Sequence, residues 1–166
     1  MKNNKGFTLT ELMTVVLIIG TLAAIAYPLY SRSIVKARLA DAIALVEIVR
    51  SAQQRNFIRT NPNKYFEKFT EAQITGDTRI IKGSGLSIKD GALRKGAYEV
   101  LIKNPVDMDK YGKNSCMRVT YYNLETGKSI FAIEALVEDS KMYCKDDNDN
   151  SDICSMISDR EGRLCK

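Results

Sequence analysis

The first thirty residues contain a long apolar run with one acidic residue inside it. Between residues 7 and 26 the only charged side chain is Glu11. Twenty residues of α-helix, at about 1.5 Å each, span the roughly 30 Å hydrocarbon core of a bilayer, so the run predicts a membrane-crossing helix. A carboxylate in such a helix costs about 2.5 to 3.5 kcal/mol even on insertion scales. Glu11 therefore requires a partner or a function.

Two ordinary N-terminal segments have a similar apolar run. In a secretory signal, Lys2 and Lys5 would form the positive start, and residues 24–26 (Ala-Ile-Ala) fit the cleavage pattern. The run is, however, longer than the roughly 7 to 15 apolar residues of such signals. A plain membrane anchor explains the length, and the two lysines would keep its N-terminus cytoplasmic. Neither alternative gives Glu11 a role.

Composition limits the chemistry that the rest of the chain can perform. The 166 residues suffice for the apolar segment and one domain with a modest core. The sequence has no histidine, which excludes histidine-based triads, imidazole general bases and histidine-ligated metals. It also shows no nucleophile motif or metal-ligand cluster, so we expect no enzymatic activity and no cofactor.

The residues around Glu11 carry a family resemblance. The stretch "KGFTLTEL" places Gly6 before Phe7 and a glutamate five residues beyond the glycine, after a short basic leader and before an unbroken apolar helix. This pattern resembles the prepilin motif of type IV pilins and of the related type II secretion pseudopilins. Gly20 and Pro28 also stand where that family has them, as points of helix break. The resemblance covers about the first thirty residues.

The resemblance implies how the N-terminus is processed and used. A prepilin peptidase would cut between Gly6 and Phe7, and a methyltransferase would methylate the new amine of Phe7. Glu11 of one subunit would then pair with the Phe7 amine of its neighbour in a helical homo-oligomer. In an apolar medium that attraction is several-fold stronger than in water, so the pair would both neutralise Glu11 and set the register. A residue without a side chain at Gly6 could lie extended in the protease cleft.

The apolar pattern continues beyond Pro28 as an amphipathic helix. Apolar residues step by three and four through Val35, Leu39, Ala42, Val46 and Val49. Ile34, Leu45, Ile48 and Ala52 widen this stripe, while charged residues occupy the other faces. The Asn61-Pro62 pair predicts the end of the helix, since proline cannot continue the hydrogen-bond ladder. We therefore expect one helix over about residues 7–60 whose second half packs against something.

The expected packing partner is a small antiparallel sheet. Residues 63–97, rich in glycine and charge, read as a connecting loop. Residues 98–102, 116–122 and 128–137 read as three strands, the last two joined by a turn around residues 125–127. The predicted fold is α+β, with a long N-terminal helix on a small antiparallel sheet and a disulfide-bonded C-terminal region, as the family resemblance also implies.

The last third of the chain holds all four cysteines, Cys116, Cys144, Cys154 and Cys165. An even number behind a membrane-targeting stretch favours two disulfides formed outside the cytoplasm over free thiols or a zinc site, because no spacing is C-x2-C. Of three pairings, a local Cys144–Cys154 loop with Cys116–Cys165 around it is favoured, since nested loops close without threading.

An acidic stretch in the tail offers one metal-site hypothesis. Asp147, Asp149 and Ser151 alternate like the early ligands of a calcium loop. The central glycine and the terminal glutamate of an EF-hand are missing. A solvated acidic loop is therefore the better interpretation, and no metal site is assigned.

The sequence yields a domain plan and a function. Residues 1–6 are a cleaved leader, 7–30 a hydrophobic transmembrane and assembly helix, and 31–166 a globular head. By resemblance, the chain is a structural pilin that enters the inner membrane once with its N-terminus cytoplasmic, and assembly machinery then builds it into an extracellular pilus for adhesion, motility or DNA uptake. A type II secretion pseudopilin or a minor tip pilin is the alternative. The basic stretch 31–113 and tyrosines such as Tyr121 and Tyr122 suggest DNA or a surface ligand as a further partner.

Overall fold

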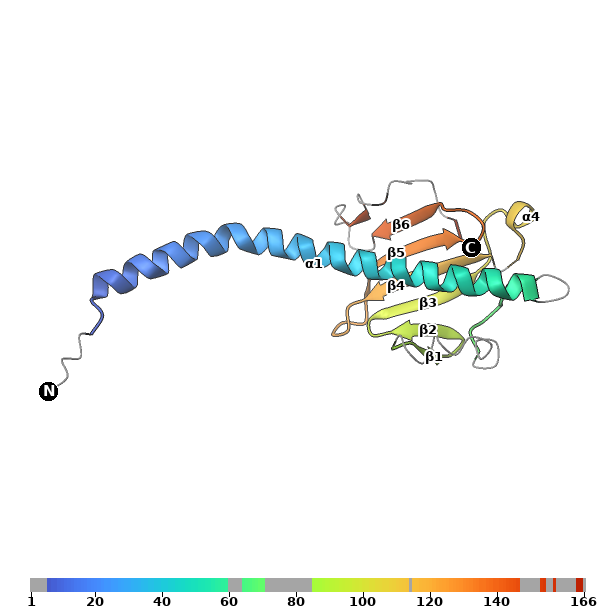
Figure 1. The fold of residues 1–166 in the computed structure, drawn as a ribbon, viewed down its shortest axis with the longest axis horizontal. Coiled ribbons are helices and arrows are strands. Elements are labelled where there is room, and N and C mark those ends of the chain that lie inside the picture. Colours follow the sequence, from blue (N-terminus) through green and yellow to red (C-terminus); the bar gives the residue numbers. More distant parts are fainter. Residues whose placement is uncertain are drawn as a thin grey trace. The chain divides into compact units, whose positions relative to one another are not determined.

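The computed structural model describes residues 6–59, 64–70, 85–113, 115–146, 153–154, 157 and 164–165. Its elements, in chain order, are α1 (Leu9–Arg59), β1 (Ser87–Lys89), β2 (Ala92–Lys95), β3 (Tyr98–Lys103), α4 (Met108–Tyr111), β4 (Cys116–Tyr122), β5 (Ser129–Leu136) and β6 (Met142–Asp146) (Figure 1). The chain divides into two compact units, Met1–Arg38 and Leu39–Lys166.

Helix α1 is continuous over 51 residues. It starts two residues later than the sequence predicted and ends one residue earlier; the predicted stop at Asn61-Pro62 lies outside the described residues. The helix continues through Gly20 and Pro28, as the prediction of one helix over about residues 7–60 requires. A proline removes one hydrogen bond from the ladder, whereas the turns on either side keep theirs, so the helix continues.

The second compact unit is built on a six-stranded antiparallel sheet in the order β1-β2-β3-β4-β5-β6. The strands predicted over residues 98–102, 116–122 and 128–137 correspond to β3, β4 and β5. The loop expected over residues 63–97 is wrong in part, because β1 and β2 lie within it. The strand β6 was not predicted either. The fold class, α+β with a long helix on an antiparallel sheet, is confirmed.

Short hairpin turns explain why β1 and β2 form in a glycine-rich stretch. Asp90 and Gly91 both have positive φ angles, 55° and 78°, and join β1 to β2. A two-residue turn of this kind matches the right-handed twist of paired strands, and Asp-Gly is one of its preferred sequences. The Asp-Gly pair was therefore a hairpin signal that the sequence analysis missed.

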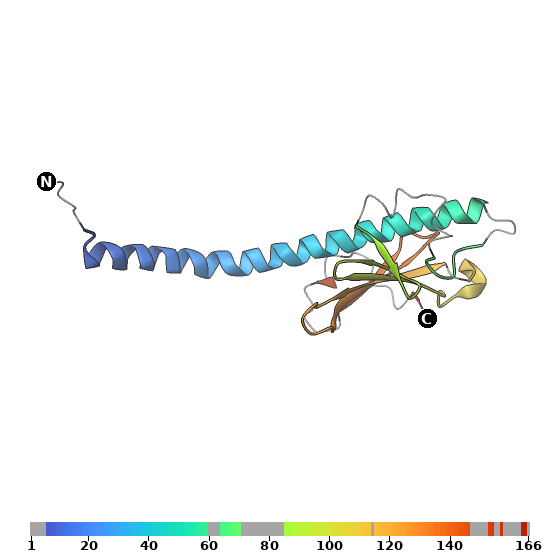
Figure 2. The same ribbon diagram turned by 90° about the horizontal axis from the view of Figure 1, so that it is seen from below.

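The core lies between the sheet and the C-terminal part of α1. Figures 1 and 2 show this part of the helix lying across one face of the sheet. Its buried residues are Leu39, Ala42, Leu45, Val46, Val49 and Gln53. On the sheet, Leu93, Val100, Val119 and Ile133 form one cross-strand row and are almost fully buried. The helix side chains Arg50 and Gln54 also donate hydrogen bonds to the carbonyls of Leu136 and Val137, at 3.1 and 3.2 Å.

Candidate functional site

The N-terminal unit presents apolar side chains that have no partner among the described residues. From Leu9 to Tyr30 the large apolar side chains are between 50% exposed, at Val15, and 74% exposed, at Tyr27. Helix α1 is long and apolar enough to cross a membrane. A surface of this size is unfavourable in water, so it requires lipid or other protein chains around it.

Glu11 takes part in capping the N-terminus of α1. The backbone N–H of Thr8 and its hydroxyl both donate to Glu11 Oε2, each at 2.8 Å, and the Glu11 N–H donates to Thr8 Oγ1 at 3.3 Å. This reciprocal arrangement is a capping box, which satisfies N–H groups that the first helical turn leaves unpaired. The Thr-x-x-Glu spacing in the sequence is the signal for this capping box, which was not predicted.

The two oxygens of Glu11 differ in their partners. Both Thr8 donors bind Oε2, and among the described residues Oε1 accepts no hydrogen bond. The capping box therefore leaves half of the carboxylate available for a donor outside the chain. Phe7, the proposed N-terminal residue of the mature chain, is 91% exposed.

Gly6 shows no structural need for glycine in this fold. A Cβ atom built on it meets nothing within 4 Å, and the same holds at Gly20. Lys2 and Lys5 lie outside the described residues. Any requirement for glycine at position 6 therefore comes from a partner that handles this segment rather than from packing within the chain.

Two disulfides bond the C-terminal region. Cys116 joins Cys165 across a separation of 49 residues, with Cα atoms 5.7 Å apart, and Cys144 joins Cys154 across 10 residues, with Cα atoms 5.3 Å apart. This is the nested pairing favoured from the sequence. Cys116 lies on β4 and Cys144 on β6, so each bridge ties a later segment to the sheet.

A buried carboxylate reinforces the bridge to Cys165. Glu134 on β5 is 4% exposed, and its Oε1 accepts hydrogen bonds from the Arg118 guanidinium, at 2.5 and 2.9 Å. Its Oε2 accepts from the backbone N–H groups of Leu164 and Cys165, at 2.9 and 3.0 Å. A buried charge is tolerated when it is paired and hydrogen-bonded in this way. This clamp was not predicted, because Glu134 and Cys165 lie 31 residues apart in the sequence.

The tail positions proposed for calcium cannot be placed. Asp147, Asp149 and Ser151 all lie outside the described residues. In the part of the chain that the structure does describe, no three acidic or cysteine side chains gather in a way that would hold a metal ion.

The tyrosines considered for ligand contact have different surroundings. Tyr121 lies between Tyr98 and Phe131, with ring centroids 4.9 and 5.3 Å away, so its ring is already packed. The neighbouring Tyr122 donates to Glu99 Oε2 at 3.1 Å, and burial together with this bond raises its pKa. Glu99 in turn pairs with Arg94 at 2.5 Å.

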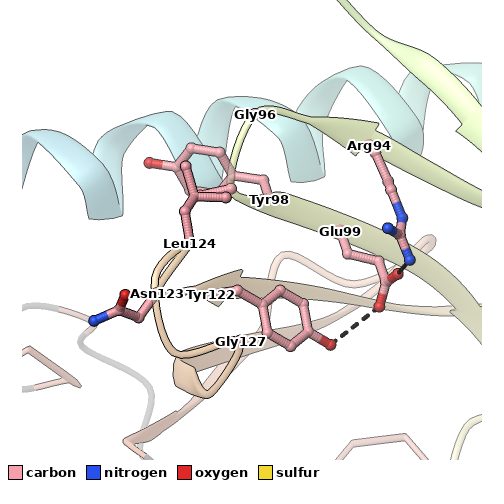
Figure 3. A pocket seen from close by; sticks show the side chains of 9 residues that line it. Arg94, Gly96, Tyr98, Glu99, Tyr122, Asn123, Leu124 and Gly127 are labelled. Carbon is pink, nitrogen blue, oxygen red and sulfur yellow. Dashed lines mark hydrogen bonds and ion pairs between the residues drawn. The ribbon is translucent and has the colours of Figure 1, made fainter.

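Figure 3 shows Tyr122, Glu99 and Arg94 on the wall of a cavity of about 380 Å³ between two hairpin turns. Glycines in the β2–β3 and β4–β5 turns, Gly96 and Gly127, also line it. Both have positive φ angles, 56° and 67°, which glycine adopts without strain. The turns that shape this cavity are therefore encoded locally.

Comparisons with known proteins found one family model and several relatives. The family model described as "Prokaryotic N-terminal methylation motif" matches residues 1–27. The chain is 37% identical over 102 residues to the type IV major pilin protein PilE1 of Neisseria gonorrhoeae, covering 61% of this chain and 54% of that protein. No solved structure matches the chain.

Two fimbrial proteins extend this similarity. The chain is 36% identical over 92 residues to the fimbrial protein of Neisseria meningitidis serogroup A, covering 54% of this chain and 52% of that protein. It is 46% identical over 54 residues to the fimbrial protein of Pseudomonas aeruginosa, covering 32% and 35%. The chain thus spans about half the length, or less, of these relatives. The resemblance to type IV pilins is confirmed.

Proposed function

We propose that this chain, as a member of the type IV pilin family, is a structural subunit of an extracellular pilus. The observation that carries the proposal is Glu11, which lies at the start of an exposed apolar helix and has one carboxylate oxygen available. The apolar part of α1 would lie in the inner membrane before assembly and among the helices of other subunits afterwards. The relatives, named as major pilins and fimbrial proteins, favour this function over a pseudopilin or a minor tip pilin.

Processing would prepare the N-terminus for assembly. A prepilin peptidase would cleave between Gly6 and Phe7, and the Phe7 amine would be methylated. Residues 1–6 would be lost as the leader, residues 7–30 would form the transmembrane and assembly segment, and residues 31–166 the head. Lys2 and Lys5 would hold the N-terminus of the precursor on the cytoplasmic side. The chain would act as a structural protein, with no catalytic role.

The two oxygens of Glu11 suggest how assembly and helix capping coexist. Oε2 would keep its bonds to Thr8, while Oε1 would accept the Phe7 amine of the next subunit. Pairing two charges in an apolar surrounding is favourable only when their remaining hydrogen-bonding capacity is also satisfied. The capping box provides part of the hydrogen bonding that the Glu11 carboxylate needs, through the two bonds from Thr8 to Oε2.

A charge-specific substitution tests this role of Glu11. Glu11→Gln keeps an oxygen that can accept from Thr8 but removes the charge, and Glu11→Ala removes both. We expect both variants to reach the inner membrane and both to lower the yield of sheared filaments at least tenfold, because the subunit pair is lost. Thr14→Ala, which removes a methyl group and a hydroxyl bonded to the Thr10 carbonyl but no charge, is the matched control. Filament yields of Glu11→Gln equal to those of the control would contradict the charge pair.

Cleavage at Gly6 has its own test. We expect Gly6→Val to accumulate as the precursor, since a β-branched side chain restricts the backbone at the scission point. Because a Cβ at this position meets nothing in the folded chain, the variant should insert in the membrane normally. Intact mass and N-terminal sequencing of the membrane fraction give the result. A wild-type product that begins at Tyr27 would instead support a secretory signal.

A further inference from the structure

The apolar part of α1 is followed closely by two exposed cations. Between Glu11 and Asp41 the only charged residues of the chain are Arg32, Lys36 and Arg38. Arg32 and Lys36 are exposed, and among the described residues neither has a hydrogen bond or an ion pair. Ion pairs along one helix need a spacing of three or four residues, and no acidic residue stands at that spacing from either cation. The two charges therefore lack a counterion on their own helix.

The position of these cations along α1 matches the headgroup layer of a bilayer. Helix α1 begins at Leu9. At about 1.5 Å per residue, Tyr30 lies about 32 Å, Arg32 about 35 Å and Lys36 about 40 Å along the helix from there. The hydrocarbon core of a bilayer is about 30 Å thick, and the headgroups extend it to about 40–45 Å. Tyr27 and Tyr30, 74% and 65% exposed, fall near the boundary, where tyrosine is enriched in membrane proteins.

The spacing of the two cations lets them share one anion. Arg32 and Lys36 stand four positions apart, so they lie on the same side of the helix, about one turn from each other. Two like charges at this spacing repel each other, and an anion between them removes that repulsion. The Cα–Cβ bonds of a helix tilt toward its N-terminus, so both side chains extend back toward the apolar segment. The pair thus offers a guanidinium and an ammonium group at the edge of the bilayer.

An anionic phospholipid has both parts that this surface requires. Its phosphate can accept hydrogen bonds from Arg32 and Lys36, and its acyl chains can cover the apolar side chains just before them, such as Leu29, which is 60% exposed. A free phosphate would meet only the first requirement. A zwitterionic lipid carries its own cation on the headgroup, which Arg32 and Lys36 would repel.

We propose that Arg32 and Lys36 together bind the phosphate of one anionic phospholipid, such as phosphatidylglycerol, in the outer leaflet of the inner membrane. This interaction rests on the proposed function for the membrane stage alone, in which α1 crosses the inner membrane before assembly. Lysine and arginine are more frequent on the cytoplasmic side of membrane proteins, so two such residues on the other side need a role there. The bound lipid fixes the depth of the unassembled subunit in the bilayer.

Native mass spectrometry of the full chain in neutral detergent micelles tests the proposal. The probes are phosphatidylglycerol and phosphatidylcholine with identical acyl chains, and the fraction of protein that carries one lipid gives each apparent Kd. We expect phosphatidylglycerol to bind at least about tenfold more tightly, and an excess of inorganic phosphate to leave it bound. The double variant Arg32→Gln with Lys36→Gln should bind the two lipids with equal affinity.

A second double variant is the matched control. Lys95→Gln with Lys128→Gln removes the same charge from exposed positions on β2 and just before β5, and it should keep the preference for phosphatidylglycerol. Glutamine, arginine and lysine have similar helix propensities, so Arg32→Gln with Lys36→Gln should keep the helix content of the wild type, measured by circular dichroism.

Two results would overturn the lipid site. Equal affinity of the wild type for the two lipids would show that the cations select no anionic headgroup; if the variant Arg32→Gln with Lys36→Gln then also lost sheared filaments, the cations would be assigned to an acidic group on another subunit. An unchanged preference in that variant would place the lipid elsewhere on the chain. Because lipid binding is measured before assembly, either result would leave the filament test of Glu11 unaffected.

Discussion

At the residue scale, a buried polar side chain makes hydrogen bonds to the backbone that a neighbouring strand would otherwise make. Gln53 is fully buried in the apolar stripe of α1, where its amide accepts from the Phe66 N–H at 2.7 Å and donates to the Phe66 carbonyl at 3.3 Å. The side chain thus pairs with Phe66 as a neighbouring strand would. Unpaired buried backbone groups are costly, so this contact holds the segment 64–70 against the helix. Gln53 is absent from the apolar stripe predicted from the sequence, so its burial was not predicted.

Tyr65, which lies in the same segment, should ionise at a higher pH than a tyrosine with the usual pKa. It is 8% exposed and donates to Glu138 Oε1 at 2.5 Å; burial first, and then the hydrogen bond and negative charge of Glu138, raise its pKa well above the usual value of 10.0. The folded state therefore favours the neutral phenol. Its contribution to stability is complete below about pH 10 and is lost as the pH rises from there through the raised folded-state pKa.

An alkaline titration followed by tyrosinate absorbance measures this shift. We expect Tyr65→Phe to remove the last ionisation step of the folded protein. Tyr30→Phe, at a position 65% exposed on α1, is the control and should leave the last step in place. A late step of unchanged amplitude in Tyr65→Phe would mean that another of the eight tyrosines is responsible.

At the element scale, the strands are held by local turns and the C-terminal segments by cross-links. Strands β1 to β6 pair in chain order, so each finds its partner nearby in the sequence. Leu164 and Cys165, by contrast, reach the sheet through Glu134, the Cys116–Cys165 bridge and a hydrogen bond from the Val106 N–H to the Leu164 carbonyl at 2.8 Å. Loss of a cross-link should therefore release the C-terminal residues from the sheet before the strands of the sheet separate from one another.

Reduction of the disulfides tests this order. In the chain-entropy model, closing loops of these lengths contributes roughly 3 kcal/mol for Cys144–Cys154 and roughly 4 kcal/mol for Cys116–Cys165. We expect no free thiol in protein from an oxidising compartment, and we expect reductant to make the C-terminal region protease-sensitive before the sheet. The double variant Cys116→Ser with Cys165→Ser should be more sensitive than Cys144→Ser with Cys154→Ser. Four labelled thiols, or identical digestion with and without reductant, would refute this.

At the scale of the whole molecule, the two compact units face different requirements. The unit Met1–Arg38 exposes apolar side chains along its helix, whereas Leu39–Lys166 buries its own core between α1 and the sheet. A chain organised in this way needs lipid or other subunits for its first unit and can keep the second in water. This division supports the proposed filament subunit, in which the N-terminal helix would assemble and the head would remain in water.

The sequence by itself determined the features that depend on neighbouring residues. The apolar run and the motif around Gly6, Phe7 and Glu11 carried the resemblance to type IV pilins, and helical periodicity placed most of the buried stripe of α1. Alternation of apolar residues located β3, β4 and β5. All of these signals are local, because the spacing of apolar residues that marks a helix or a strand involves positions only two to four residues apart.

The tertiary structure decided the features that join distant residues. The clamp of Glu134 on Leu164 and Cys165 spans about thirty residues, and the pairing of Gln53 with Phe66 spans thirteen. The cross-strand row of Thr120, Ala132 and Lys145 likewise depends on the register of β4, β5 and β6. No sequence period encodes such contacts, since they arise only when the sheet fixes which strands are neighbours and which side chains share a face.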